Sequence, residues 1–303
     1  MQTLETTASP EREHMDRPSQ PAPRKARLGT GPQPNLNQVR LTWTLARLTA
    51  KRLIRRKLFW FLSLLSLLPC LVVFYWIIDR FAANWSSPEM PFAMFRNIQA
   101  VYFHIFFMPL LSVFMGLGVI SEEIESKNIT FTLVRPLNRA SIAVGRLLGH
   151  LLAASLLLSV AVFCNFMSNM VFQVEELIPT LPNLINGILI LCAGLAGYMS
   201  VVAMLGTFWK KFAILGSIIF LLMDTAFSLI PVATLNFISV RFRMMAAYWE
   251  PLPRFLPSLI DIPRGSFVLN IALIFVLFVA IPLGVMAFRL SQFEIVLGGG
   301  EAG

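Results

Sequence analysis

Charged side chains are scarce in this chain of 303 residues, where Asp, Glu, Lys and Arg together make up only 14%. Ordinary soluble domains carry about 25%. Hydrophobic residues instead reach 56%, and the mean hydropathy is +0.71. The composition therefore excludes an ordinary soluble domain and predicts an integral membrane protein.

Groups that build metal, disulfide or nucleotide sites are also scarce. Cys70, Cys164 and Cys192 are far apart and lack paired spacing, so no disulfide framework or zinc site is predicted. His104 and His150 have no ligand spacing to other residues. Nothing matches G-x-x-x-x-G-K-[ST], the loop that cradles nucleotide phosphates, so no cofactor is expected in this chain.

The N-terminal segment divides into two parts. Residues 1–35 are rich in proline and polar residues and lack the apolar core of a signal peptide, so we expect a disordered cytoplasmic tail. Residues 36–57 predict a basic amphipathic helix along the inner leaflet, with a generic basic stop signal as the alternative. Its apolar residues recur at three- and four-residue spacing, at Leu36, Val39, Trp43, Ala46, Ala50 and Leu53.

Six apolar windows are long enough to cross a bilayer, which takes about 20 residues. They lie at 58–78, 101–120, 142–170, 184–208, 212–231 and 266–288. The fourth and fifth windows are separate spans because Lys210 and Lys211 lie between them and would be costly at the membrane centre. Residues 58–290 thus predict a six-span domain in an all-α protein, followed by a cytoplasmic tail at 291–303.

The distribution of Lys and Arg predicts the orientation of these spans. Most of the basic residues that flank spans lie before the first span, after the second and between the fourth and fifth. Because positive residues concentrate on the cytoplasmic side, both termini are expected in the cytoplasm. The loop 232–265 then faces outward, and we expect short interfacial helices there, with Tyr248 and Trp249 at the lipid headgroups.

A charged loop at 121–139 interrupts the apolar sequence after the second span. Glu122, Glu123 and Glu125 would lie in the first turn of a short helix, where the helix dipole favours anions. Pro136 would end that helix. These features alone leave a solvated connector that merely fixes topology as an equal alternative.

The same stretch resembles the hallmark region of ABC transporter permeases of the type-2 exporter class. The residues that carry the resemblance are Glu123, Glu125, Lys127, Ile129, Thr130, Leu133, Arg135, Pro136, Asn138, Arg139, Gly145 and Arg146. Two departures are Lys127 and Asn128 where a glycine is usual, and Asn138 where serine is commoner. In that family the loop is a coupling helix that docks on a separate ATPase subunit. The resemblance implies this role for Glu122, Glu123, Glu125, Lys127, Arg135, Pro136 and Arg139.

The resemblance further implies a permease subunit of an ATP-driven exporter in the plasma (inner) membrane. Such a subunit is not itself an enzyme, and ATP and Mg would bind to the partner ATPase. Six spans are half of the usual twelve, so a second permease copy or a paired permease is expected. Membrane lipid is a further expected partner, and nucleic acid is not.

Three polar side chains within the spans are candidates for a translocation pathway: Asp224, Asn165 and Asn169. A carboxyl group at membrane depth is costly and often functional. The structural alternatives are an internally paired or protonated Asp224, and hydrogen bonds between helices from the two asparagines.

Other functions are left open by the residues alone. A membrane anchor or assembly subunit would keep the same spans without transporting. A secondary transporter would call for inverted repeats, and no convincing internal repeat is present. A glutamate-dependent intramembrane protease uses a Glu-Glu-x-x-x-Arg motif, but Lys127 stands at the place of the arginine here.

Overall fold

The computed structural model describes residues 38–82, 90–119, 139–171, 174–208, 212–230, 232, 236–249 and 266–292. Within these ranges the regular secondary structure is helical and contains no strand. Five segments are long and apolar enough to cross a membrane: Lys57–Trp76, Phe92–Leu117, Ala140–Met170, Val174–Phe208 and Phe267–Leu290. A shorter apolar helix covers Ala213–Ser228. The prediction of an all-helical membrane protein with about six spans is confirmed, whereas its sidedness stays a prediction.

The first span is divided into α2 (Lys57–Ser66) and α3 (Leu68–Ala82). Pro69 explains the division, because it lacks the N–H that would bond to the Leu65 carbonyl one turn earlier. The Tyr102 hydroxyl, from the second span, donates a hydrogen bond to that carbonyl at 2.5 Å. A backbone N–H of the helix cap also donates to this carbonyl, so a side chain of the second span adds a second donor at the break in the first.

The second and sixth spans each contain a π-helical stretch between two α-helical ones. The second span consists of α4 (Met90–Ile98), η1 (Gln99–Phe107) and α5 (Met108–Leu117), and the sixth of α13 (Phe267–Leu273), η2 (Ile274–Ala280) and α14 (Ile281–Gln292). Pro109 and Pro282 lie at the second position after each π-helical stretch. Proline has no backbone N–H, so it cannot donate an α-helical hydrogen bond to the preceding turn. Each π-helical stretch therefore lies next to a position where the α-helical hydrogen bonding is already interrupted.

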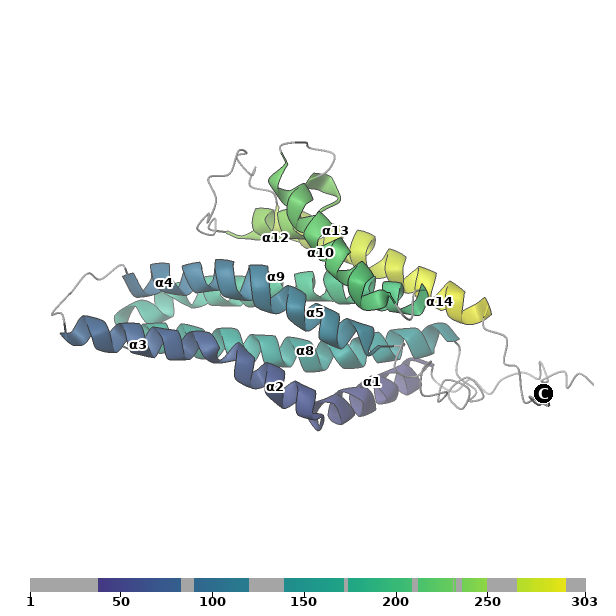
Figure 1. Cartoon of the computed structure of the whole chain (residues 1–303), viewed down its shortest axis with the longest axis horizontal. Helices are drawn as coiled ribbons and strands as arrows, with labels where there is room; N and C mark the ends of the chain where they lie inside the picture. Colours follow the sequence, from purple (N-terminus) through teal and green to yellow (C-terminus); the bar gives the residue numbers. More distant parts are fainter. Residues whose placement is uncertain are drawn as a thin grey trace, which may run out of the picture. The chain divides into compact units, whose positions relative to one another are not determined.

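The third and fourth spans are the long helices α8 (Arg139–Met170) and α9 (Val174–Phe208), which pack against each other (Figure 1). The window predicted at 184–208 misses the first turns of α9, which contain Pro179 and Pro182. Large buried side chains fill the core between α4, η1 and α8. Phe95 packs edge-on against Phe166 with ring centroids 5.1 Å apart.

The fifth span, α10 (Ala213–Leu229), contacts α9, α5 and α12 (Val240–Ala247). The helix α12 lies in the loop 232–265, where short interfacial helices are expected. Most of its residues are buried in the protein, and so is Tyr248, whereas Trp249 is exposed. Gly194 on α9 explains the close packing, because a methyl group there would lie 2.1 Å from Met244 Sδ.

Candidate functional site

The charged loop that is predicted to dock on an ATPase lies between α5 and α8. Glu122, Glu123, Glu125, Lys127, Arg135 and Pro136 fall outside the described residues, and Arg139 is the first residue of α8. The structure therefore describes how the two helices that flank the loop are held, and this determines what the loop can move.

The helix that follows the loop, α8, packs closely against α1 (Gln38–Ile54), which lies next to it in Figure 1. A methyl group on Gly149 would lie 2.6 Å from the Ala46 carbonyl oxygen and 2.6 Å from Thr49 Cβ. One on Gly145 would lie 3.0 Å from the Thr42 carbonyl oxygen. Both glycines are thus needed for α1 to approach α8 this closely.

The helix that precedes the loop, α5, is held in a similar way against α9. A methyl group on Gly116, at the loop end of α5, would lie 2.9 Å from Val202 Cγ1 and 3.1 Å from the Met199 carbonyl oxygen. Each flanking helix therefore meets a neighbour through a glycine within about two turns of the loop.

The face of α1 that meets α8 differs from the predicted apolar stripe. Ala46 and Leu53 are buried, whereas Val39 and Trp43 from the same stripe are exposed. The exposed surface of α1 also carries basic side chains, at Arg40, Arg47, Lys51 and Arg52. The helix is consequently anchored on protein along one side and leaves cationic and apolar groups available to lipid.

Asp224 on α10 forms the centre of a buried polar cluster and is only 2% exposed. Its carboxyl group accepts hydrogen bonds from the Tyr198 hydroxyl at 2.5 Å, the Val240 N–H at 2.8 Å and the Arg241 N–H at 3.2 Å. Val240 and Arg241 are the first residues of α12, so the carboxyl group meets the positive end of that helix. Asp224 therefore fastens α12 to α10 and, through Tyr198, to α9.

Ser239 completes this attachment as the N-cap of α12. Its hydroxyl oxygen accepts from the Phe242 N–H at 3.2 Å, and the hydroxyl group donates to the Asp224 carbonyl oxygen at 3.3 Å. The buried Arg241 guanidinium interacts electrostatically with Asp224 and Tyr198, while burial lowers the pKa of Arg241. The geometry gives Asp224 an internally paired structural role.

Asn165 and Asn169 lie one turn apart on α8 and are both buried. The Asn169 side-chain amide donates to the Asn165 carbonyl oxygen at 2.7 Å, within the same helix. Among the described residues no hydrogen bond joins either asparagine to Asp224 or to another helix. The three candidates for a translocation pathway are thus not brought together into one hydrogen-bonded group.

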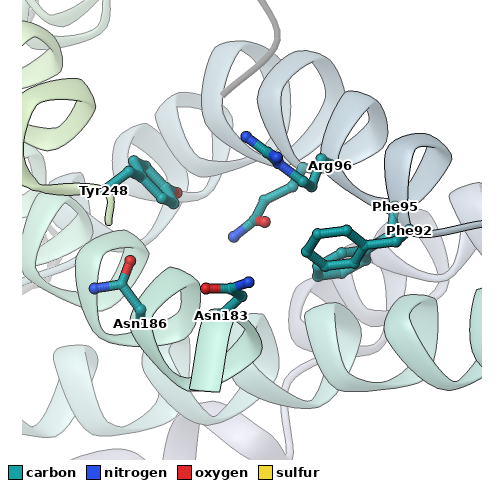
Figure 2. Close-up of a pocket in the computed structure, with 7 residues that line it drawn as sticks. Phe92, Phe95, Arg96, Asn183, Asn186 and Tyr248 are labelled. Atoms are coloured by element: carbon teal, nitrogen blue, oxygen red, sulfur yellow. The ribbon is translucent and has the colours of Figure 1, made fainter. Parts of the chain in front are cut away.

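A small polar pocket lies where the starts of the second and fourth spans meet the residues after α12 (Figure 2). We call it the amide pocket, and its cavity measures about 10 Å³. It is lined by Phe92, Phe95, Arg96, Gln99, Asn183, Asn186 and Tyr248. Sequence reasoning missed this pocket because its residues come from three distant segments. The sequence feature that could have indicated the pocket is the presence of the amide side chains Gln99, Asn183 and Asn186 at the starts of two apolar windows.

The comparisons with known proteins agree with this architecture. The family model described as ABC-2 family transporter protein matches residues 43–247, which is more than half of the chain. The chain belongs to the ABC-2 transporter family. It is accordingly a multi-pass membrane permease subunit of an ABC transporter rather than a catalytic enzyme. No curated protein matches the chain.

The matched region of this ABC-2 permease begins within α1 and ends with α12. It therefore includes the charged loop, the glycine contacts on both of its flanks and the cluster around Asp224. Within the described ranges no three His, Cys, Asp or Glu side chains lie close enough together to hold a metal ion.

Proposed function

We propose that this permease subunit couples ATP hydrolysis in a separate nucleotide-binding subunit to export of a substrate through the membrane. The loop 121–139 would be the docking element on the ATPase. The observation that carries the proposal is the close glycine packing of both helices that flank this loop. A loop joined to two firmly packed helices can transmit a displacement into the spans instead of absorbing it.

The path of that displacement follows from the contacts. The unbroken helix α8 runs from Arg139 at the loop to Met170. A push on its first turn would carry α1 along, because the Ala46 carbonyl group and the Thr49 side chain of α1 lie directly against Gly149. The push on α5 would pass to α9 at Gly116. The loop therefore has mechanical access to at least three spans and to α1.

The partners follow from what the chain contains. The sequence lacks a G-x-x-x-x-G-K-[ST] loop, so ATP and Mg would bind to the ATPase subunit. A second permease, either another copy or a paired chain, would complete the transporter. The broad apolar surface of α10 supports contact with lipid or with that second permease, since six large side chains are exposed there: Ile214, Leu215, Ile218, Ile219, Leu222 and Met223.

The direction of transport and the plasma membrane location rest on the resemblance of the loop to type-2 exporters. The residues proposed to dock on the ATPase are Glu122, Glu123, Glu125, Lys127, Arg135, Pro136 and Arg139. The glutamates would meet basic groups of the ATPase or cap the short helix, and the arginines would pair with them or with lipid phosphate.

The first experiment is purification of the full chain from its own membranes in mild detergent, followed by measurement of ATPase activity. We expect a soluble ATPase to copurify with the permease. Charge reversal in Glu123→Lys/Glu125→Lys should abolish its copurification or uncouple its activity while leaving the permease folded.

A matched control is Glu175→Lys/Glu176→Lys, which reverses two neighbouring charges in the first turn of α9, away from the loop. This control should keep wild-type coupling. Wild-type coupling in the loop variant would show that docking occurs elsewhere. A preparation that contains no ATPase at all would favour a membrane anchor that does not transport.

A further inference from the structure

The second and sixth spans share one backbone pattern where their two α-helical halves meet. The Met108 N–H donates to the Phe103 carbonyl oxygen, which lies five residues earlier instead of the usual four. The Ile281 N–H donates to the Val276 carbonyl oxygen in the same way. The next residue is a proline in both spans. Helices bend at π-helical turns and at prolines, so each span combines two causes of bending at one place.

The halves of these spans that lie nearest the charged loop are α5 and α14, and we call them the loop-side halves. They end at one apolar cluster, which joins the loop-side ends of four spans. Its buried residues are Val119, Ala143, Leu147, Ala203, Met286 and Leu290. The Arg289 guanidinium also lies 5.5 Å from the centre of the Phe208 ring, which adds a contact between α14 and α9. Because tightly packed apolar side chains resist separation, the loop-side halves should follow α8 and α9 when the loop moves.

The opposite halves, α4 and α13, are held by different contacts. The helix α13 packs against α12, and Arg243 of α12 donates a hydrogen bond to the Asn270 side-chain oxygen at 3.2 Å. In turn, Asp224 fastens α12 to α10. The helix α4 packs against the far end of α8, where the Phe95 ring meets Phe166. A movement of the loop therefore acts on α5 and α14 before it acts on α4 and α13.

The π-helical stretches between these halves are themselves held against α9, at a glycine in each case. A methyl group on Gly197 would lie 3.2 Å from Ile274 Cγ2 and 3.3 Å from Phe278 Cβ, both in η2. Gly187 makes the corresponding close contact with Gln99, the first residue of η1. Each stretch is thus fixed in position on α9, and the half beyond it can change direction about that point.

We propose that η1 and η2 are paired hinges at which the loop-side halves of the second and sixth spans bend together when the charged loop moves. The inference rests on the proposed function, because the ATPase would supply that movement. The helix α5 has 10 residues and α14 has 12, so a bend of about 20° would displace their ends by roughly 5–6 Å. Access would then change at one end of the membrane domain while the other end keeps its packing.

The first test measures the flexibility of both hinges by hydrogen–deuterium exchange of the full chain alone, in lipid nanodiscs. The amides of 99–108 and 274–281 should exchange about tenfold faster or more than those of 150–160. The last segment is the reference because it belongs to the uninterrupted helix α8 and lies a similar number of residues from the loop. Pro109→Ala and Pro282→Ala restore an N–H donor, so each should slow exchange in its own stretch without lowering the midpoint of thermal unfolding.

The second test measures ATP turnover by the ATPase that copurifies with the permease. Pro109→Ala and Pro282→Ala should each lower turnover about fivefold or more, because a stiffer permease opposes the movement of the ATPase. Pro109→Gly and Pro282→Gly should keep wild-type turnover, since glycine leaves the helix flexible. If the hinges act together, the double alanine variant should be no slower than the slower single variant. Pro182→Ala, in the first turns of α9, is the matched control and should leave turnover unchanged.

Fast exchange in both stretches that alanine slows, together with reduced turnover in the alanine variants, would support the hinges. Equal exchange in all three segments would overturn them, and so would wild-type turnover in both alanine variants. A preparation without any ATPase would contradict the exporter function instead. In that case the exchange measurements on the permease alone still decide whether the two stretches are hinges.

Discussion

Substitution of Gly149 by alanine tests the backbone contact between α1 and α8. The added methyl group would lie 2.6 Å from the Ala46 carbonyl oxygen and from Thr49 Cβ. Neither atom can move without its backbone, so the helices must separate, and overpacking of this kind costs about 1–3 kcal/mol. Alanine gains up to about 1 kcal/mol over glycine within a helix. We therefore expect a net destabilisation of about 1–2 kcal/mol.

Gly284→Ala on α14 is the matched control, because nothing lies within 4 Å of a methyl group at that position. It should keep only the gain from helix propensity, up to about 1 kcal/mol. Gly145→Ala should fall between the two variants, since its nearest backbone contact is 3.0 Å.

The assay for this series is the midpoint of thermal unfolding of the full chain in one detergent, measured for all three variants and the wild type. Equal midpoints for Gly149→Ala and Gly284→Ala would refute the close contact. The order Gly284→Ala, Gly145→Ala, Gly149→Ala from most to least stable would support it. If the loop drives α8 and α1 together, Gly149→Ala should also lower substrate-stimulated ATPase activity in the assembled transporter.

Three further predictions concern contacts inside the membrane domain. Tyr102→Phe should destabilise the protein by about 0.5–1.5 kcal/mol, because the Leu65 carbonyl loses one of its two donors and keeps the backbone N–H of the helix cap. An unchanged midpoint of thermal unfolding would show that this bond does not stabilise the protein. Asp224→Ala should cost on the order of 3 kcal/mol and expose α12 to protease, whereas unchanged cleavage would mean that α12 is held by other contacts. Gly194→Ala should destabilise the protein, and the same substitution should cost less in a Met244→Ala background, where the added methyl group has room, which a double-mutant cycle measures.

The helical class and the approximate number of spans were predictable because a bilayer demands about 20 apolar residues for each crossing. That rule reads local composition, so it missed the early turns of α9, where Pro179 and Pro182 lower the apolar character. It also gave no information on which face of α1 meets protein. That choice depends on Gly145 and Gly149, which lie far away in the sequence.

The candidate site was less predictable than the spans. Asp224 was identified as a costly carboxyl group, but its partners Tyr198, Val240 and Arg241 are set by packing and not by spacing. The same holds for the amide pocket, in which Gln99 faces residues from two other segments. The docking role of the charged loop stays a prediction, supported by the packing of its flanks.

The bond from Tyr102 to the Leu65 carbonyl has a consequence for biosynthesis. Pro69 supplies no N–H at the break, so within the first span the Leu65 carbonyl has only the backbone donor of the helix cap. The Tyr102 hydroxyl adds a second donor in a region where no water offers one. The break in the first span is therefore a reason for the second span to insert directly beside it.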